Sequence, residues 1–194
     1  LLIASALGVA TWRQCAHWRD SRALWDRVLS IDPANYVALY KRGKARFDAG
    51  ELDGAIADYR AAIAVDAEGA SAWFHLGDAE RTRRNDAAAL AAYDAALARR
   101  PDEPVFLARR GAFLAETGDP ARGLPDLDRA LALAPGDVLT RTNRANARWL
   151  LGDARGTIED AERVLREAPQ NWAPRAALER MLQKARERAS AGGG

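Results

Sequence analysis

The side chains best suited to chemistry are scattered along this sequence. Cys15 and His17 stand two residues apart, and on a helix such neighbours point in different directions. His75 alone supplies no ligand set. A glycine-rich phosphate loop, a paired-histidine metal motif and a nucleophile elbow are all absent from the sequence. We therefore expect no catalytic residue, no metal and no cofactor within these residues, although a longer protein containing them could be an enzyme.

Opposite charges recur at one spacing. The arginines of three segments are each followed, sixteen residues later, by an aspartate: Arg42 and Asp58, Arg110 and Asp126, Arg144 and Asp160. In the second segment both charges are missing, and Leu76 and Ala92 take their places. Because a lone buried charge is costly, this joint loss predicts ion pairs between two helices, with a structural role.

A fixed period organises the chain. Proline or alanine closes successive segments at positions 33, 67, 101, 135 and 169, which are 34 residues apart every time. Such a period indicates a stack of repeated elements instead of one globular core. We expect an apolar segment with a partial repeat (1–35), four full repeats (36–69, 70–103, 104–137 and 138–171), a capping helix (172–190) and a disordered tail (191–194).

Each full repeat has the pattern of two helices joined by a turn. In the first, residues 36–49 and 52–65 are the helices, and Gly50 begins the turn. Gly118 and Gly152 recur there, and Arg84-Asn85 replaces the glycine in the second repeat; a left-handed helix terminus favours glycine or asparagine. Small residues recur where paired helices approach closely: Gly43, Gly77, Gly111 and Ala145.

These positions resemble the tetratricopeptide repeat family. The second repeat carries the resemblance best, through Trp73, Leu76, Gly77, Ala89, Tyr93, Ala96 and Pro101. The fourth repeat departs from the family pattern, with Arg141, Arg144 and Arg148 where apolar or aromatic residues are usual. The resemblance covers residues 36–171. It implies an all-α, right-handed superhelical solenoid of antiparallel helix pairs with a C-terminal capping helix.

The resemblance also implies a binding groove lined by the first helix of each repeat. Carried over by the period, two rows and their neighbours give the expected groove residues: Tyr40, Lys41, Lys44, Phe47, Phe74, His75, Asp78, Arg81, Arg109, Asn143, Asn146 and Trp149. Aromatic rings among hydrogen-bonding groups suit recognition of a peptide or partner protein. The alternative is that these residues solvate the groove or pack against neighbouring helices.

Two groove patterns known in the family fit poorly. Lys44, His75 and Arg109 reproduce only in part the clamp that holds a terminal carboxylate in some chaperone-binding members. Asn143 is the only asparagine in its row, whereas the ladder of certain sugar-transferring members needs several. We therefore predict neither pattern.

The first ten residues do not fit the repeats. They are apolar and too short for a membrane span of roughly 20 residues. We expect the trailing end of a span that begins upstream, with Trp12 and Trp18 at the interface. The alternative is the first helix of a degenerate repeat. Trp12-Arg13, Trp18-Arg19-Asp20-Ser21 and Leu24-Trp25, followed by repeats, resemble the junction in polytopic O-mannosyltransferase-like membrane proteins.

The expected function is non-catalytic binding of a protein or peptide in the groove, by the soluble tail of a membrane protein. One alternative is an acceptor-presenting accessory domain of a membrane glycosyltransferase, and another is a scaffold that self-associates. The resemblance implies an extracytoplasmic, periplasmic location, whereas Arg13, Arg19, Arg22 and Arg27 indicate the cytoplasmic side. The net charge of +2 gives little field to attract nucleic acid, so we expect no nucleic-acid partner.

Overall fold

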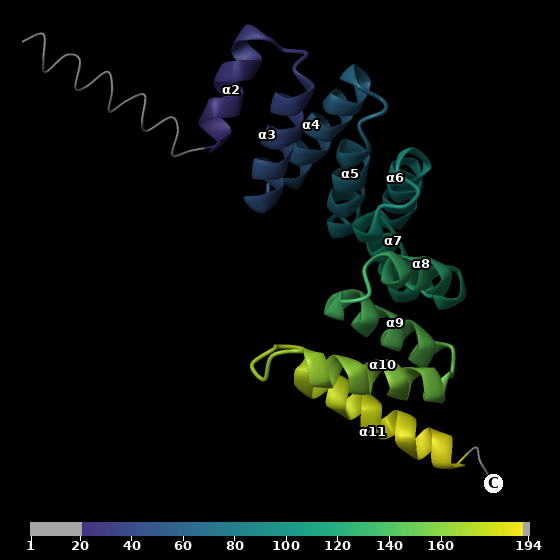
Figure 1. Ribbon diagram of the computed structural model, residues 1–194. Helices are drawn as coiled ribbons and strands as arrows, with labels where there is room; N and C mark the ends of the chain where they lie inside the picture. The colour runs from purple at the N-terminus through teal and green to yellow at the C-terminus, as the bar shows by residue number, and fades with distance from the viewer. Residues whose placement is uncertain (1–20, 192–194) are drawn as a thin grey trace, which may run out of the picture. The chain divides into compact units, whose positions relative to one another are not determined.

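The computed structural model describes residues 21–191, and every regular element in that range is an α-helix (Figure 1). The chain divides into two compact units at Arg99 and Arg100. The helices of unit 1 are α2 (Ser21–Ile31), α3 (Tyr36–Asp48), α4 (Leu52–Val65), α5 (Ala70–Thr82) and α6 (Asp86–Arg99). Those of unit 2 are α7 (Pro104–Glu116), α8 (Pro120–Leu133), α9 (Val138–Leu150), α10 (Ala154–Glu167) and α11 (Arg175–Ala191). The expected all-α fold is confirmed for the described residues.

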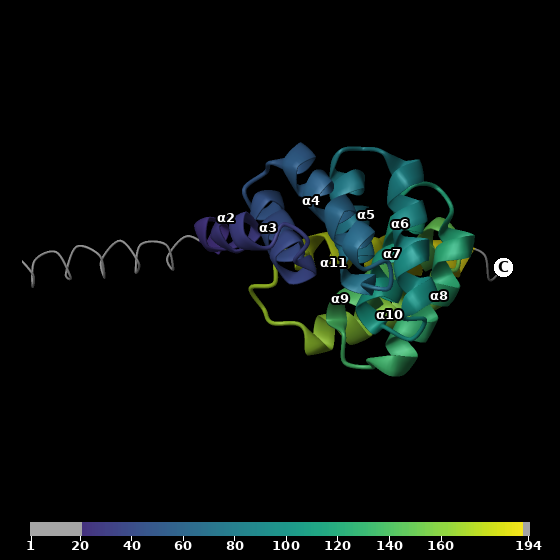
Figure 2. The same ribbon diagram turned by 90° about the horizontal axis from the view of Figure 1, so that it is seen from above.

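Consecutive helices pair as hairpins, which Figures 1 and 2 show side by side: α3 with α4, α5 with α6, α7 with α8, and α9 with α10. Gly50, Gly118 and Gly152 begin three of the turns with φ of +79°, +95° and +82°. In the second repeat the left-handed residue is Arg84, with φ of +63°, and not Asn85. Arg84 adopts this conformation because it occupies the position in the turn that glycine holds in the other repeats.

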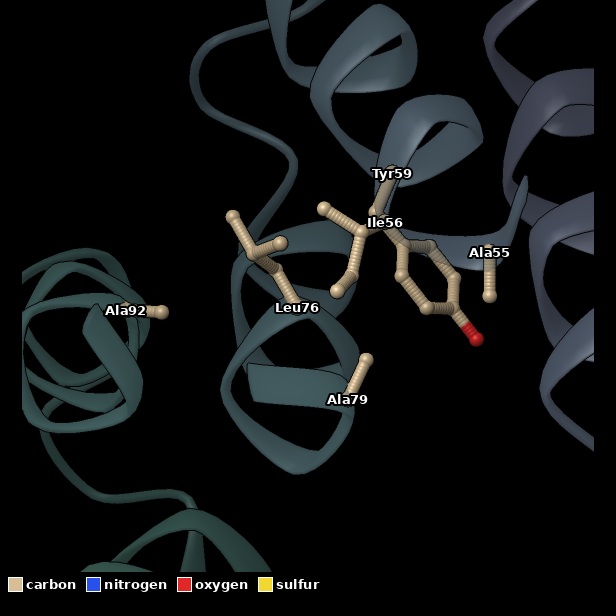
Figure 3. Packing of buried hydrophobic residues seen from close by; sticks show 6 residues of the cluster. All are labelled: Ala55, Ile56, Tyr59, Leu76, Ala79 and Ala92. Atoms are coloured by element: carbon tan, nitrogen blue, oxygen red, sulfur yellow. The ribbon is translucent and has the colours of Figure 1, made fainter. Parts of the chain in front are cut away.

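Small residues on the first helix of a hairpin make room for large ones on the second. A Cβ atom added at Gly43 would lie 2.8 Å from Cε1 of Tyr59, and one added at Gly77 would lie 2.6 Å from the ring of Tyr93. Tyr59 is fully buried and belongs to the apolar cluster of α4, α5 and α6 that Figure 3 shows. The helices therefore approach until a tyrosine ring fills the space above each glycine.

The expected ion pairs are present in all three hairpins. Arg42 donates two hydrogen bonds to Asp58, from Nε and Nη2, at 2.9 and 2.7 Å. The same two-pronged contact joins Arg110 to Asp126 at 2.7 and 2.9 Å. It recurs between Arg144 and Asp160 at 2.8 and 2.6 Å. Each pair joins the first helix of a hairpin to the second, as the spacing predicted.

A second arginine reinforces two of these pairs. Asp58 also accepts from Arg46 at 2.9 Å, and Asp160 accepts from Arg148 at the same distance. Hydrogen bonding to the carboxylate raises the pKa of Arg144 above its ordinary value. Two of the three unusual arginines of the fourth repeat, Arg144 and Arg148, are thereby explained, because they share one buried aspartate.

Arg141, the third unusual arginine, is only 2% exposed and has its own partners. Its Nη1 donates to Glu167 at 2.6 Å, and its Nη2 donates to the carbonyl oxygen of Pro135. A guanidinium with both a carboxylate and a carbonyl can be buried without an uncompensated charge.

The expectations for the two chain ends fall largely outside the described residues. The apolar segment expected to be the end of a membrane span lies in residues 1–20, which the structure does not describe. No helix within residues 21–191 has the length and apolar character needed to cross a bilayer. At the other end α11 includes Ala191, so the first residue of the expected disordered tail is helical, and residues 192–194 are not described.

Arg144 provides an internal comparison for the buried ion pairs, because it contacts one buried and one exposed carboxylate. The side chain of Asp160 is 2% exposed, whereas that of Asp128, bound through Nη1 at 2.9 Å, is 48% exposed. We predict that Asp160→Ala lowers the free energy of unfolding by about 2–4 kcal/mol, since two arginines lose their buried partner. Asp128→Ala should cost less than about 1 kcal/mol. Urea unfolding of both variants measures the difference, and equal losses would contradict a structural role for the buried pair.

Candidate functional site

The most distinctive surface of unit 1 is an aromatic patch formed by Tyr36, Tyr40 and His75. Tyr36 and Tyr40 stack on one face of α3, with ring centroids 6.3 Å apart and planes 6° from parallel. His75 of α5 lies 5.4 Å from Tyr40, ring centroid to ring centroid. All three residues are half-buried, so rings from two successive first helices are partly exposed to solvent.

Charged groups surround the aromatic patch. Nζ of Lys41 lies 5.6 Å from the centroid of the Tyr40 ring, a cation–π distance. Lys44, one turn further along α3, pairs with the exposed Asp48 at 2.7 Å. On α5, a carboxylate oxygen of Asp78 lies 3.9 Å from Nδ1 of His75. The patch therefore offers apolar rings, ammonium donors and a carboxylate acceptor over a short span.

Two buried tyrosines lie beneath this surface, and their hydroxyl groups differ. Tyr93 donates to Asp78 at 2.8 Å. Tyr59, its counterpart 34 residues earlier, has a buried hydroxyl that finds no hydrogen-bond partner among residues 21–191, and Figure 3 shows it pointing away from Leu76. The sequence explains the difference, because Lys44 stands 34 residues before Asp78 and offers no acceptor. Burial raises the pKa of Tyr59, so its hydroxyl stays protonated as a donor.

The remaining expected groove residues of unit 1 are more enclosed. Phe74 is only 5% exposed and packs edge-on against His75, so it supports the patch from below and is not a free contact residue. Phe47 packs against the apolar cluster around Tyr59. Arg81 is half-buried near the end of α5. The first-helix positions thus divide into an open patch and its apolar support.

In unit 2 the expected groove residues lie on α7 and α9. Arg109 is exposed on α7. Asn143 and Asn146 are half-buried on α9, and neither amide forms a hydrogen bond within the described part of the chain. Asn146 lines a cavity of about 470 Å³ together with Glu116 and Leu150.

Trp149, the last expected groove residue, is covered on one face. The guanidinium of Arg188, on α11, lies 5.6 Å from the centroid of its ring. The indole therefore packs under the last helix instead of standing open beside the two asparagines. Sequence reasoning missed this contact, because it joins helices that are far apart in the sequence.

Sequence reasoning also missed two members of the aromatic system. Tyr36 stands one helical turn before Tyr40, a spacing that places both rings on one face. Tyr59 was not among the expected groove residues, yet its ring lies 5.9 Å from that of His75, with the planes 20° apart. The recurrence of tyrosine opposite Gly43 and Gly77 was the available signal.

Aromatic rings with charged neighbours are groups of the kind that protein-recognition surfaces use. No group of three or more His, Cys, Asp or Glu side chains within residues 21–191 is placed to hold a metal ion. Cys15 and His17 lie outside the described residues. The candidate contact groups in the described part of the chain are therefore the aromatic patch of unit 1 and the amide and cationic side chains of unit 2.

Comparison with known proteins supports the repeat architecture. The family model described as Tetratricopeptide repeat matches residues 16–64 and 40–104. Protein FlbA of Caulobacter vibrioides is 34% identical over 110 residues, which are 57% of this chain and 18% of that protein. The chain spans about a fifth of the length of the curated relatives that it matches.

Solved structures with the same fold cover most of the chain. A crystal structure of MamA protein matches with a TM-score of 0.69 and 20% identity, over 81% of this chain and 86% of that one. YrrB, described as a TPR protein with an unusual peptide-binding site, matches with a TM-score of 0.72 and 18% identity, over 85% and 86%. At this identity the likeness establishes the fold alone.

Removing the hydroxyl group should change the free energy of unfolding differently at the two buried tyrosines. Tyr93→Phe should lower the free energy of unfolding by about 1–3 kcal/mol, because the hydrogen bond to the Asp78 carboxylate is lost. Tyr59→Phe should cost less than about 0.5 kcal/mol or stabilise the protein, because it removes an unsatisfied buried donor. Urea unfolding of both variants measures these effects. A larger loss for Tyr59→Phe than for Tyr93→Phe would contradict the assigned hydrogen bonding.

Proposed function

We propose that this chain, which has the tetratricopeptide repeat fold and matches that family's model in its first half, is a non-catalytic module that binds an extended segment of a partner protein. The first-helix face of unit 1, formed by α3 and α5, is the proposed contact surface. The partner lies across the aromatic patch and meets Lys41, Lys44 and Asp78 at its margin.

One observation carries this proposal: three aromatic rings from two helices remain partly open to solvent at one place. Burying such rings is favourable, and the fold leaves all three only half-buried. Protein interfaces are enriched in aromatic side chains surrounded by polar groups that fix register. The patch has both parts, with Lys41 and Asp78 as its polar neighbours.

The support beneath the patch favours recognition without rearrangement. Phe74 and Tyr59 hold His75 from two sides, at 5.2 and 5.9 Å between ring centroids. The pairing of Arg42 with Asp58 holds α3 against α4. A surface whose side chains are already ordered loses less conformational entropy when a partner binds.

The likeness of residues 1–35 to a glycosyltransferase junction gains no support from the comparisons, and the family match extends into that segment from residue 16. Attachment to a membrane and presentation of acceptor proteins to a glycosyltransferase therefore stay hypotheses that rest on the sequence alone. Partner binding has further support in the half-buried aromatic patch of unit 1.

The proposal predicts a loss of capture without a loss of stability. Lys41→Ala combined with Lys44→Ala removes two exposed ammonium groups whose intramolecular contacts are worth less than about 1 kcal/mol each. We expect the melting temperature to stay near that of the parent protein. Partners captured from a lysate of the native host should fall about tenfold, as quantified by mass spectrometry.

A matched control separates position from charge. Arg83→Ala combined with Arg122→Ala also removes two exposed cations, each of which pairs with an exposed aspartate near a helix turn. The control should retain the captured partners. Equal capture by all three proteins would exclude the patch as the binding surface.

A further inference from the structure

Exposed aliphatic side chains recur beside the loops that join one repeat to the next. They occupy two positions of the 34-residue period, the last residue of a second helix and the second residue of the first helix that follows. The first position holds Ile31, Val65 and Leu133, and the second holds Val37, Val105 and Leu139. Each of the six residues is between 45% and 73% exposed. Apolar side chains left uncovered at a repeated position mark a surface that a partner can bury.

In unit 1 three of these side chains lie at one end of α2, α3 and α4. We name Ile31, Val37 and Val65 the loop edge. Figure 1 shows the loop after α2 and the loop after α4 at the same end of these helices. A buried apolar cluster packs the three helices together near that end, and it includes Leu29, Ala38 and Ala62. The loop edge therefore has a fixed base.

The two loops beside the loop edge carry negative charge. Asp32 accepts from the backbone N–H of Ala34 at 3.3 Å, and Asp66 accepts from that of Glu68 at 3.0 Å. Neither aspartate forms an ion pair within residues 21–191. Glu68 has Arg99 at 3.8 Å. Arg99 thus offsets one of the three carboxylates, and the charges of the two aspartates remain uncompensated.

We propose that the loop edge of unit 1 binds a basic, apolar segment of a partner protein. Lysine or arginine side chains of the segment meet Asp32 and Asp66, and its apolar side chains cover the loop edge. Burial of the aliphatic groups supplies affinity, and the carboxylates select a cationic partner. An anionic lipid surface does not fit, because the same carboxylates repel it.

The loop edge is a second contact surface, so this inference goes beyond the proposed function. It lies at the ends of helices, whereas the aromatic patch is formed by rings on α3 and α5. A partner segment held here makes its contacts with aliphatic side chains and loop carboxylates, and it needs none of the three rings of the patch.

The experiment uses a fluorescein-labelled, end-blocked peptide of repeated leucine–lysine–lysine triplets as the probe. It is titrated with the protein and followed by fluorescence anisotropy at about 0.15 M salt. We expect saturable binding. Peptides in which serine replaces every leucine, or glutamate replaces every lysine, should bind at least about tenfold more weakly.

The aliphatic part of the contact is tested by substitutions to serine. Val65→Ser should weaken binding of the probe about threefold, and Val65→Ser combined with Ile31→Ser at least about tenfold. The matched control is Leu151→Ser, because Leu151 is 43% exposed and Val65 is 45% exposed. Leu151 lies in the turn after α9, so the control should bind like the parent protein.

The charged part is tested by Asp32→Asn combined with Asp66→Asn, which should weaken binding at least about threefold. Each asparagine keeps an oxygen that can accept from the loop N–H. The control, Asp53→Asn combined with Asp86→Asn, removes two exposed carboxylates near the starts of α4 and α6, at the opposite end of the hairpins, and should bind normally. All variants should melt near the parent protein, as followed by circular dichroism.

Four results would overturn the proposal. They are the absence of saturable binding, equal binding of the serine peptide, equal weakening by a variant and its control, and self-association that Ile31→Ser combined with Val65→Ser abolishes. Sedimentation measures the last, which would assign the loop edge to a second copy of this chain. Capture by the Lys41 and Lys44 variant reports on the aromatic patch, so the two surfaces can fail independently.

Discussion

Three of the four hairpins share one interaction, the two-pronged contact between an arginine of the first helix and an aspartate of the second. A guanidinium that donates two parallel hydrogen bonds to a carboxylate fixes both distance and orientation. Arg42 with Asp58, and Arg144 with Asp160, hold their hairpins this way around carboxylates that are almost fully buried. Hydrogen bonding to Asp58 raises the pKa of Arg42 further, so this guanidinium stays charged at every physiological pH.

These contacts face the interior of each hairpin and leave the outer side of the first helix to other residues. Gly43 and Gly77 let the second helix approach until Tyr59 and Tyr93 fill the space. Those rings then support His75 and Phe74 from beneath. Packing thus produces a rigid base on which Tyr40 and Lys41 are presented without taking part in hairpin closure.

Much of this was predictable because the 34-residue period repeats local chemistry. The helix 52–65 and the turn at Gly50 were predicted with correct bounds, and the charge spacing identified all three ion pairs. The period did not predict the surroundings of side chains at positions where neighbouring repeats pack differently. Phe74 was expected in the groove but is buried, because its ring turns toward Tyr93. Trp149 is covered by Arg188 through a contact between distant helices, which no local pattern encodes.

The most direct test of the account is hydrogen exchange of the chain with and without a captured partner. The account predicts that slowed exchange on binding is confined to first helices, with α3 and α5 most affected, while α4 and α6 exchange as in the free protein. Solvent-exposed backbone at a contact surface gains protection when a partner covers it. Protection confined to α4 and α6, with α3 and α5 unchanged, would contradict the account.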